Sequence, residues 1–141
     1  MRIERAHSRH SASQLFDLVA DIERYPQFLP WVISARITRR DDRTVWVTMV
    51  MGTRLLRRQF STIATLQRPH RIDITSRDPM FERFDQRWIF TAGAEGGTDI
   101  EYRTDFKFRS ALLQALIGGS FAERAPAMMQ AFKRRARQLY G

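Results

Sequence analysis

The side chains that most often perform catalysis or bind metals are few and scattered in this chain. It has three histidines and no cysteine, which excludes disulfides and cysteine-ligated metals. His7 and His10 lie three residues apart on a predicted strand, so their side chains should face opposite sides, and His70 falls in a predicted turn. A metal needs several converging ligands, so we predict no metal site.

Acid–base and nucleophilic catalysis also lack the expected residues. The chain has no Gly-x-Ser-x-Gly motif and no recognisable Ser-His-Asp arrangement. Asp78 and Asp85 are the acids nearest to the candidate cavity described next, and both fit better as turn or surface residues. We therefore expect no catalytic residues and no enzyme activity.

The residues favour the binding of a flexible apolar ligand in a cavity. The segment Tyr25–Trp31 combines three large side chains with Pro26 and Pro30, and it could form the stiff wall of a cavity mouth. Aromatic side chains on later strands, together with Met128 and Met129, could line the interior. The alternative is that all of these residues simply fill the core, as aromatics and methionines usually do.

Basic residues outnumber acidic ones, which gives a net charge of +9 and a pI of about 11.2. Such a chain is attracted to phosphate-rich partners such as anionic lipid headgroups or ribosomal RNA. Nothing resembles a DNA-binding motif, and we expect no DNA partner. The clusters could equally be solvated faces without a partner. The candidate docking residues are Arg39, Arg40, Arg54, Arg57, Arg58, Lys133, Arg134 and Arg135.

The elements that must position these residues can be read from the hydrophobic periodicity. Residues 2–10 predict a strand, and Ser11 with Gln14 predicts a capping box that begins a helix. A second short helical turn should follow Asp21 and end among the prolines. From Trp31 onward the pattern changes to strands, and residues 99–108 alternate strictly. The order predicts an α+β fold in which a curved antiparallel sheet of about six to seven strands surrounds one long C-terminal helix.

The C-terminal helix, residues 110–140, has two apparent faults. Ala125, Met129, Phe132, Ala136 and Leu139 recur on one face. However, Gly118-Gly119 should cost roughly 2 kcal/mol relative to two alanines, and Pro126 about 3 kcal/mol. We interpret residues 110–118 as a movable gate, residues 119–126 as a joint and residues 127–140 as the anchored half.

The bulk composition predicts a single domain over residues 1–141. Hydrophobic residues make up 43% and charged residues 28% of the chain, which is typical of a globular protein. No apolar run approaches the roughly 18 residues of a membrane span, and the first residues do not resemble a signal peptide. We expect a cytoplasmic protein that can associate peripherally with the inner membrane.

Several motifs together resemble one family. An apolar helix leads into Tyr25-Pro26-Gln27-Phe28-Leu29-Pro30-Trp31, which is similar to the family's Tyr-Pro-x-Phe-x-Pro-Trp. Residues 78–81 resemble its Gly-Pro-Phe loop, with Asp78 in place of the glycine, and residues 88–90 its Trp-x-Phe. Residues 132–141 resemble Phe-x-x-Arg-Ala-x-x-Leu-Tyr-Gly. These are features of the coenzyme Q-binding protein family, within the START-like, polyketide cyclase-type superfamily.

The resemblance implies a helix-grip fold with an apolar tunnel between the sheet and the long helix. It also implies a ligand such as ubiquinone or another long-chain prenyl lipid, and no other cofactor. The residues expected to line this tunnel are Phe16, Tyr25, Pro26, Phe28, Leu29, Pro30, Trp31, Phe60, Phe81, Phe84, Trp88, Phe106, Leu113, Leu116, Phe121, Met128, Met129 and Phe132.

Three functions therefore remain open at the level of the sequence. The first is a non-catalytic carrier of quinone for respiration or quinone biosynthesis, held at the membrane surface by basic residues. The second is a ribosome-binding factor that blocks subunit association, because bacterial members of the family often carry the label of ribosome-association toxin. The third and weakest is a polyketide cyclase-type enzyme, which would need a buried acid–base pair.

Overall fold

Strands with one apolar face build a single antiparallel sheet, and the computed structural model confirms the expected α+β helix-grip fold. The structure describes residues 1–52 and 55–141, and for residues 117–123 it describes the backbone alone. Seven strands pair in the order β1-β7-β6-β5-β4-β3-β2. Their bounds are β1 (Arg2–Ser8), β2 (Val32–Arg40), β3 (Thr44–Gly52), β4 (Arg57–Gln67), β5 (Arg71–Thr75), β6 (Phe81–Ala92) and β7 (Thr98–Phe108).

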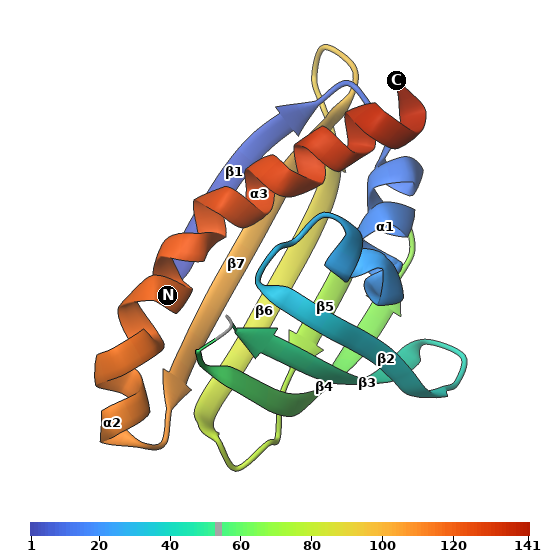
Figure 1. The fold of residues 1–141 in the computed structure, drawn as a ribbon. Coiled ribbons are helices and arrows are strands. Elements are labelled where there is room, and N and C mark those ends of the chain that lie inside the picture. Colours follow the sequence, from blue (N-terminus) through green and yellow to red (C-terminus); the bar gives the residue numbers. More distant parts are fainter. Residues whose placement is uncertain (53–54) are drawn as a thin grey trace.

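The helices gather on one face of this sheet. Figure 1 shows α3 crossing that face diagonally, with α1 beside its C-terminal half. The strands β2 and β3 run at a steep angle to β6 and β7, so the sheet curves around the helix (Figure 1). The bounds are α1 (Ala12–Ala20), the 3-10 helix η1 (Ile22–Gln27), α2 (Ala111–Leu113), the π-helical turn η2 (Gln114–Gly118) and α3 (Gly119–Tyr140).

The helix α1 begins where the sequence predicts. The Gln14 backbone N–H donates to the Ser11 hydroxyl at 3.1 Å, and the Ser11 N–H donates to the Gln14 side-chain oxygen at 3.0 Å. This reciprocal capping box satisfies two N–H groups that a helix start leaves without partners. Leu15, Phe16 and Val19 are buried, and they fasten α1 to the sheet.

The two faces of the sheet differ as the alternation in β7 predicts. Ile100, Tyr102 and Thr104 are buried beneath the helices, whereas the neighbouring charged residues point outward. On the outer face Arg103 donates to Glu101 at 2.8 Å, and similar arginine–carboxylate pairs join adjacent strands. The outer face is therefore solvated and ion-paired, and the apolar chemistry is confined to the face that α3 covers.

The C-terminal helix differs from the expectation in one respect. The faults at Gly119 and Pro126 do not interrupt the helix, because α3 is continuous from Gly119 to Tyr140 and includes Pro126. The change in helix type comes earlier, at the π-helical turn η2. A proline removes one main-chain hydrogen bond, and α3 tolerates the loss because Ala125 and Met129, on either side of Pro126, are buried against the sheet. Leu139, placed on the buried stripe by its spacing, is 50% exposed.

Candidate ligand-binding cavity

A cavity lies between α3 and the curved face of the sheet, where the helix-grip fold was expected to leave a tunnel. Its volume is about 50 Å³, which is room for a few water molecules. The described side chains that line it are Ile22, Tyr25, Leu29, Trp31, Val32, Met49, Met51, Thr62, Ile74, Phe84, Gln86, Tyr102, Thr104, Arg124, Ala125 and Met128.

The segment from η1 to β2 forms one wall of the cavity. The Tyr25 hydroxyl donates to the Val19 carbonyl, which ties this wall to the end of α1. The Leu29 N–H donates to the Tyr25 carbonyl at 2.8 Å, and the Gly52 N–H donates to the Trp31 carbonyl at 3.0 Å. The two prolines of the segment are exposed on its outer side. The wall is therefore held by main-chain hydrogen bonds on both sides of Leu29.

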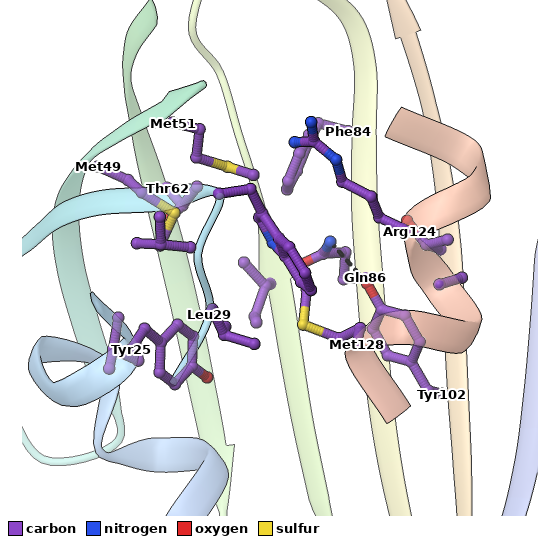
Figure 2. Close-up of a pocket in the computed structure, with 16 residues that line it drawn as sticks. Tyr25, Leu29, Met49, Met51, Thr62, Phe84, Gln86, Tyr102, Arg124 and Met128 are labelled. Atoms are coloured by element: carbon purple, nitrogen blue, oxygen red, sulfur yellow. Dashed lines mark hydrogen bonds between the residues drawn. The ribbon is translucent and has the colours of Figure 1, made fainter. Parts of the chain in front are cut away.

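The sheet contributes a mixed wall of methionines and polar side chains. Met49 and Met51 come from β3, while Gln86 and Tyr102 come from β6 and β7. The Gln86 amide donates to the Tyr102 hydroxyl at 2.8 Å. Figure 2 shows Met49 and Met51 on one side of the cavity and the Gln86–Tyr102 pair on the other.

The helix α3 supplies Arg124, Ala125 and Met128 from a single turn and a half. The Arg124 guanidinium carbon lies 5.7 Å from the centre of the Trp31 ring, a cation–π contact between α3 and the η1–β2 wall. Figure 2 shows Arg124 and Met128 on the same side as Phe84 and Gln86. The cavity is thus polar toward β6, β7 and α3, and apolar toward η1, β2 and β3.

The cavity side chains offer no ready acid or base. Among the described lining residues there is no histidine and no carboxylate. Burial raises the pKa of both Tyr25 and Tyr102 well above the usual range, so both hydroxyls stay protonated at neutral pH. Within the described residues no group of three or more His, Asp or Glu side chains is arranged to hold a metal ion.

The structure divides the predicted tunnel residues into several groups. Five line the cavity, and most of the others are packed in the core on either side of it. Tyr25, Leu29, Trp31, Phe84 and Met128 line it. Phe16, Phe28, Trp88, Met129 and Phe132 pack near the C-terminal half of α3. Phe60, Phe81 and Phe106 belong to an aromatic group at the start of β6, which adjoins the cavity through Phe84.

The remaining predicted tunnel residues lie elsewhere. Pro26 and Pro30 are exposed, Leu113 is half-buried and Leu116 is 64% exposed. Phe121 lies outside the residues whose side chains the structure describes.

Several lining residues were absent from the prediction, and most could have been found by strand parity. Gln86 stands between Phe84 and Trp88 on the same face of β6, and Thr104 follows Tyr102 on β7. Thr62 shares the buried face of β4 with Phe60. The alternation placed these residues inward, but the prediction selected aromatic, aliphatic, methionine and proline side chains and left out these polar ones. Arg124 had no such signal, because charged helix residues are usually solvated.

The predicted docking residues do not form one surface. Arg40 pairs with Val45 and Arg57 with Gly52, so the two arginine clusters lie at opposite ends of β3, roughly 25 Å apart. Arg39, Arg58 and Arg134 are exposed, and Lys133 is half-buried. Arg54 lies outside the described residues.

Arg135 is occupied within the fold. Its guanidinium donates to the Gln27 side chain at 2.7 Å and lies 5.3 Å from the centre of the Phe28 ring. This side chain fastens α3 to the end of η1, and it is not a free docking charge.

The fold and the cavity define a helix-grip protein with a small, mostly apolar interior site. The chain belongs to the polyketide cyclase / dehydrase and lipid transport family, whose profile matches residues 8–133. It is 30% identical over 132 residues to the ribosome association toxin RatA of Pseudomonas aeruginosa, covering 94% of this chain and 92% of that protein.

A second relative and a solved structure confirm the predicted resemblance. The chain is 25% identical over 147 residues to the mitochondrial coenzyme Q-binding protein COQ10 homolog B of Xenopus laevis, covering 99% of this chain and 60% of that protein. The structure of a START superfamily protein from Mycobacterium smegmatis superposes with a TM-score of 0.81 at 17% identity, covering 98% of this chain and 97% of that chain. At that identity the likeness shows a shared fold.

Proposed function

We propose that this protein is a non-catalytic carrier of a long-chain prenyl lipid, with ubiquinone as the first candidate. The observation that carries the proposal is the apolar site enclosed between α3, the η1–β2 wall and β3. A relative named as a coenzyme Q-binding protein aligns with 99% of this chain, which supports the choice of ligand. Delivery of quinone to respiration or to its own biosynthesis would be the role.

Loading such a lipid requires the cavity to open. Sites for drug-sized ligands usually measure about 300–1,000 Å³, whereas this cavity has about 50 Å³. Met49, Met51 and Met128 line it, and unbranched methionines can adopt new rotamers at low cost. In the α2–η2 segment, Leu112 and Leu116 are exposed and do not anchor it to the sheet. Its attachments include Leu113, which packs against the core, and the Gln114 side chain, which accepts from the Phe108 N–H at 3.0 Å. We propose that this segment is the gate.

The absence of acid–base groups from the described lining supports a carrier over a cyclase. A general base must lie within hydrogen-bond reach of the substrate and have a pKa near the working pH. Tyr25 and Tyr102 fail the second condition because burial raises the pKa of each. The Arg124 guanidinium stays protonated and only donates hydrogen bonds, so it cannot act as a general base.

One end of the molecule suits contact with an anionic membrane. Leu112 and Leu116 are 68% and 64% exposed on α2 and η2, and Leu55 is 97% exposed after β3; we call these three the leucine rim. Leu55 precedes β4 and Leu112 follows β7, and these strands are linked through the start of β6, because the Phe81 ring is 5.2 Å from both Phe60 on β4 and Phe108 on β7. Exposed arginines at this end include Arg57, Arg58, Arg77 and Arg109. Exposed leucines among arginines match an interface of acyl chains and anionic headgroups.

Organic extraction tests the proposal directly. Protein purified from a quinone-containing host should release a prenyl quinone that mass spectrometry identifies, and lipid-free protein should take up ubiquinone from detergent. A matched preparation of an unrelated small protein controls for carry-over. A lipid-free extract combined with no uptake on reconstitution would reject the carrier.

A ribosome-binding role is the second candidate, favoured by the relative at 30% identity that is named a ribosome association toxin. Charge reversal of Arg57 and Arg58 should then abolish any effect of the protein on subunit association in sucrose gradients. Reversal of Arg39 and Arg40, at the other end of β3, is the matched control. Wild-type protein that leaves the subunit profile unchanged would reject this role. Lipid uptake in detergent should survive both reversals if the protein is a carrier.

A further inference from the structure

Arg124 is an arginine without an acceptor inside an otherwise mostly apolar site. Its side chain is partly buried and lines the cavity, and among the described residues no carboxylate or carbonyl accepts from it. Some other arginines of the fold are ion-paired: Arg71 and Arg87 both donate to Asp73, at 2.7 and 2.8 Å. Arg124 has no such carboxylate partner among the described residues.

Trp31, on which Arg124 stacks, has the same deficiency. Its indole nitrogen is buried and has no hydrogen-bond partner among the described residues. A buried donor that lacks an acceptor destabilises a fold, and native structures seldom retain one without a reason. This buried indole N–H and the partly buried Arg124 guanidinium meet at a cation–π contact beside one cavity.

The rest of the cavity is arranged around these donors as a polar side and an apolar side. Gln86, Tyr102 and Thr104 lie with Arg124 on the side formed by β6, β7 and α3. Figure 2 shows Tyr25, Leu29 and Met49 on the opposite side. An amphiphile bound across the cavity would place its oxygen-bearing end at Arg124 and its hydrocarbon chain against the methionines.

We infer that Arg124 and Trp31 form the head-group site of this cavity, and that its ligand carries an oxygen acceptor such as a quinone carbonyl or a carboxylate. The inference rests on the proposed carrier function. Arg124 donates from its guanidinium and Trp31 from its indole N–H. Desolvation also lowers the pKa of Arg124. A ligand acceptor here would replace some of the hydrogen bonds to water that the guanidinium loses on burial.

Three apolar probes that differ in their head groups separate the possible sources of the acceptor. Ubiquinone-3 has a farnesyl-length chain and a quinone head, palmitate has a carboxylate, and squalane is a hydrocarbon without any head group. Binding to lipid-free protein in dilute detergent is measured by titration calorimetry. The variants are Arg124→Met, which keeps the length but removes the donors, and Trp31→Phe, which removes the N–H but keeps a ring.

The expected result is selective. Hydrogen bonds to a charged group contribute enough that Arg124→Met should weaken the affinity for the acceptor-bearing probe by about tenfold or more. The affinity for squalane should stay unchanged or increase. Trp31→Phe should weaken the same probe by a smaller factor. If the variants lose affinity for ubiquinone-3 alone, the head group is a quinone. If they lose affinity for palmitate alone, it is a carboxylate.

A second cation–π pair provides matched controls. Arg39 lies 4.5 Å from the centre of the Trp46 ring, and neither residue lines the cavity. Arg39→Met and Trp46→Phe should leave all three affinities unchanged. Thermal unfolding of every variant verifies that binding losses do not come from misfolding.

The failures can be told apart. If wild-type protein binds ubiquinone-3 and squalane equally and Arg124→Met changes neither, the Arg124–Trp31 contact is only a structural stack and the inference is overturned while the carrier stands. If palmitate binds in an Arg124-dependent manner and ubiquinone-3 does not bind, the head-group site stands and the quinone proposal falls. If no probe binds the wild-type protein, both are rejected.

Discussion

The two halves of the C-terminal helical segment pack very differently against the same sheet. At the C-terminal half, the Phe132 ring lies 5.4 Å from Tyr25, 5.1 Å from Phe28 and 5.0 Å from Trp88, and Ala136 is completely buried. At the N-terminal end, Leu112 and Leu116 project into solvent. The cavity lies between these regions. The C-terminal half therefore anchors the helix to the sheet, whereas the N-terminal end leaves room for a ligand to enter.

Side-chain size explains much of this difference. Ala131 and Ala136 are buried on the C-terminal half of α3, and such small residues let the helix backbone approach the sheet closely. Next to the cavity the helix instead presents Arg124 and Met128, which are long and have many rotamers. Close packing at one end supports an adaptable site at the other.

The largest effect is expected at the packed half. Phe132→Ala removes the ring that joins α3 to Tyr25, Phe28 and β6, and it should lower the free energy of unfolding by about 3–5 kcal/mol. Urea denaturation measures the loss. Leu116→Ala, on the exposed end, is the control and should change stability by less than about 0.5 kcal/mol. Equal losses for the two variants would mean that the halves are anchored alike.

A smaller effect is expected where α1 supports the packed half. Arg68 donates to both oxygens of Asp17, at 2.8 and 3.0 Å, and this hydrogen bonding lowers the pKa of Asp17. A carboxyl with a lowered folded-state pKa contributes stability above its unfolded pKa, near 3.9, and loses it as the pH falls through the folded value. Because both side chains are about half exposed, Asp17→Asn should cost about 0.2–1 kcal/mol at pH 7.

The pH dependence separates this ion pair from a general packing defect. The stability difference between wild type and Asp17→Asn should shrink below about pH 4 and vanish once Asp17 is protonated in the wild type. Asp42→Asn, in the exposed turn between β2 and β3, is the control. A difference that stays constant down to pH 2 would show that the substitution acts through something other than charge.

The smallest effect on stability, with a clear effect on binding, is expected at the exposed end. Leu112→Ser combined with Leu116→Ser should change the free energy of unfolding by less than about 0.5 kcal/mol per site. The same pair should weaken the affinity for vesicles of anionic phospholipid, measured by co-sedimentation, by about tenfold or more. The reason is that two apolar side chains no longer enter the interface. Leu139→Ser, at the other end of α3, is the matched control. Unchanged vesicle binding would remove the leucine rim from the docking surface.

The amino-acid sequence by itself determined the scaffold of this protein. Its alternation assigned the buried and solvated faces of β7, and Ser11 with Gln14 fixed the start of α1. Both are local effects, because the strand period and the capping hydrogen bonds depend on residues a few positions apart. The motif around Tyr25–Trp31 also identified the family correctly.

Only the tertiary structure decided which inward side chains face empty space and which fill the core. Trp88 and Gln86 share one face of β6, yet Gln86 lines the cavity and Trp88 packs against Phe132. The difference depends on where α3 crosses the sheet, which a period of two cannot specify. The same holds for Arg124 and Trp31. They are 93 residues apart in sequence, and their contact exists only because the helix closes over the η1–β2 wall.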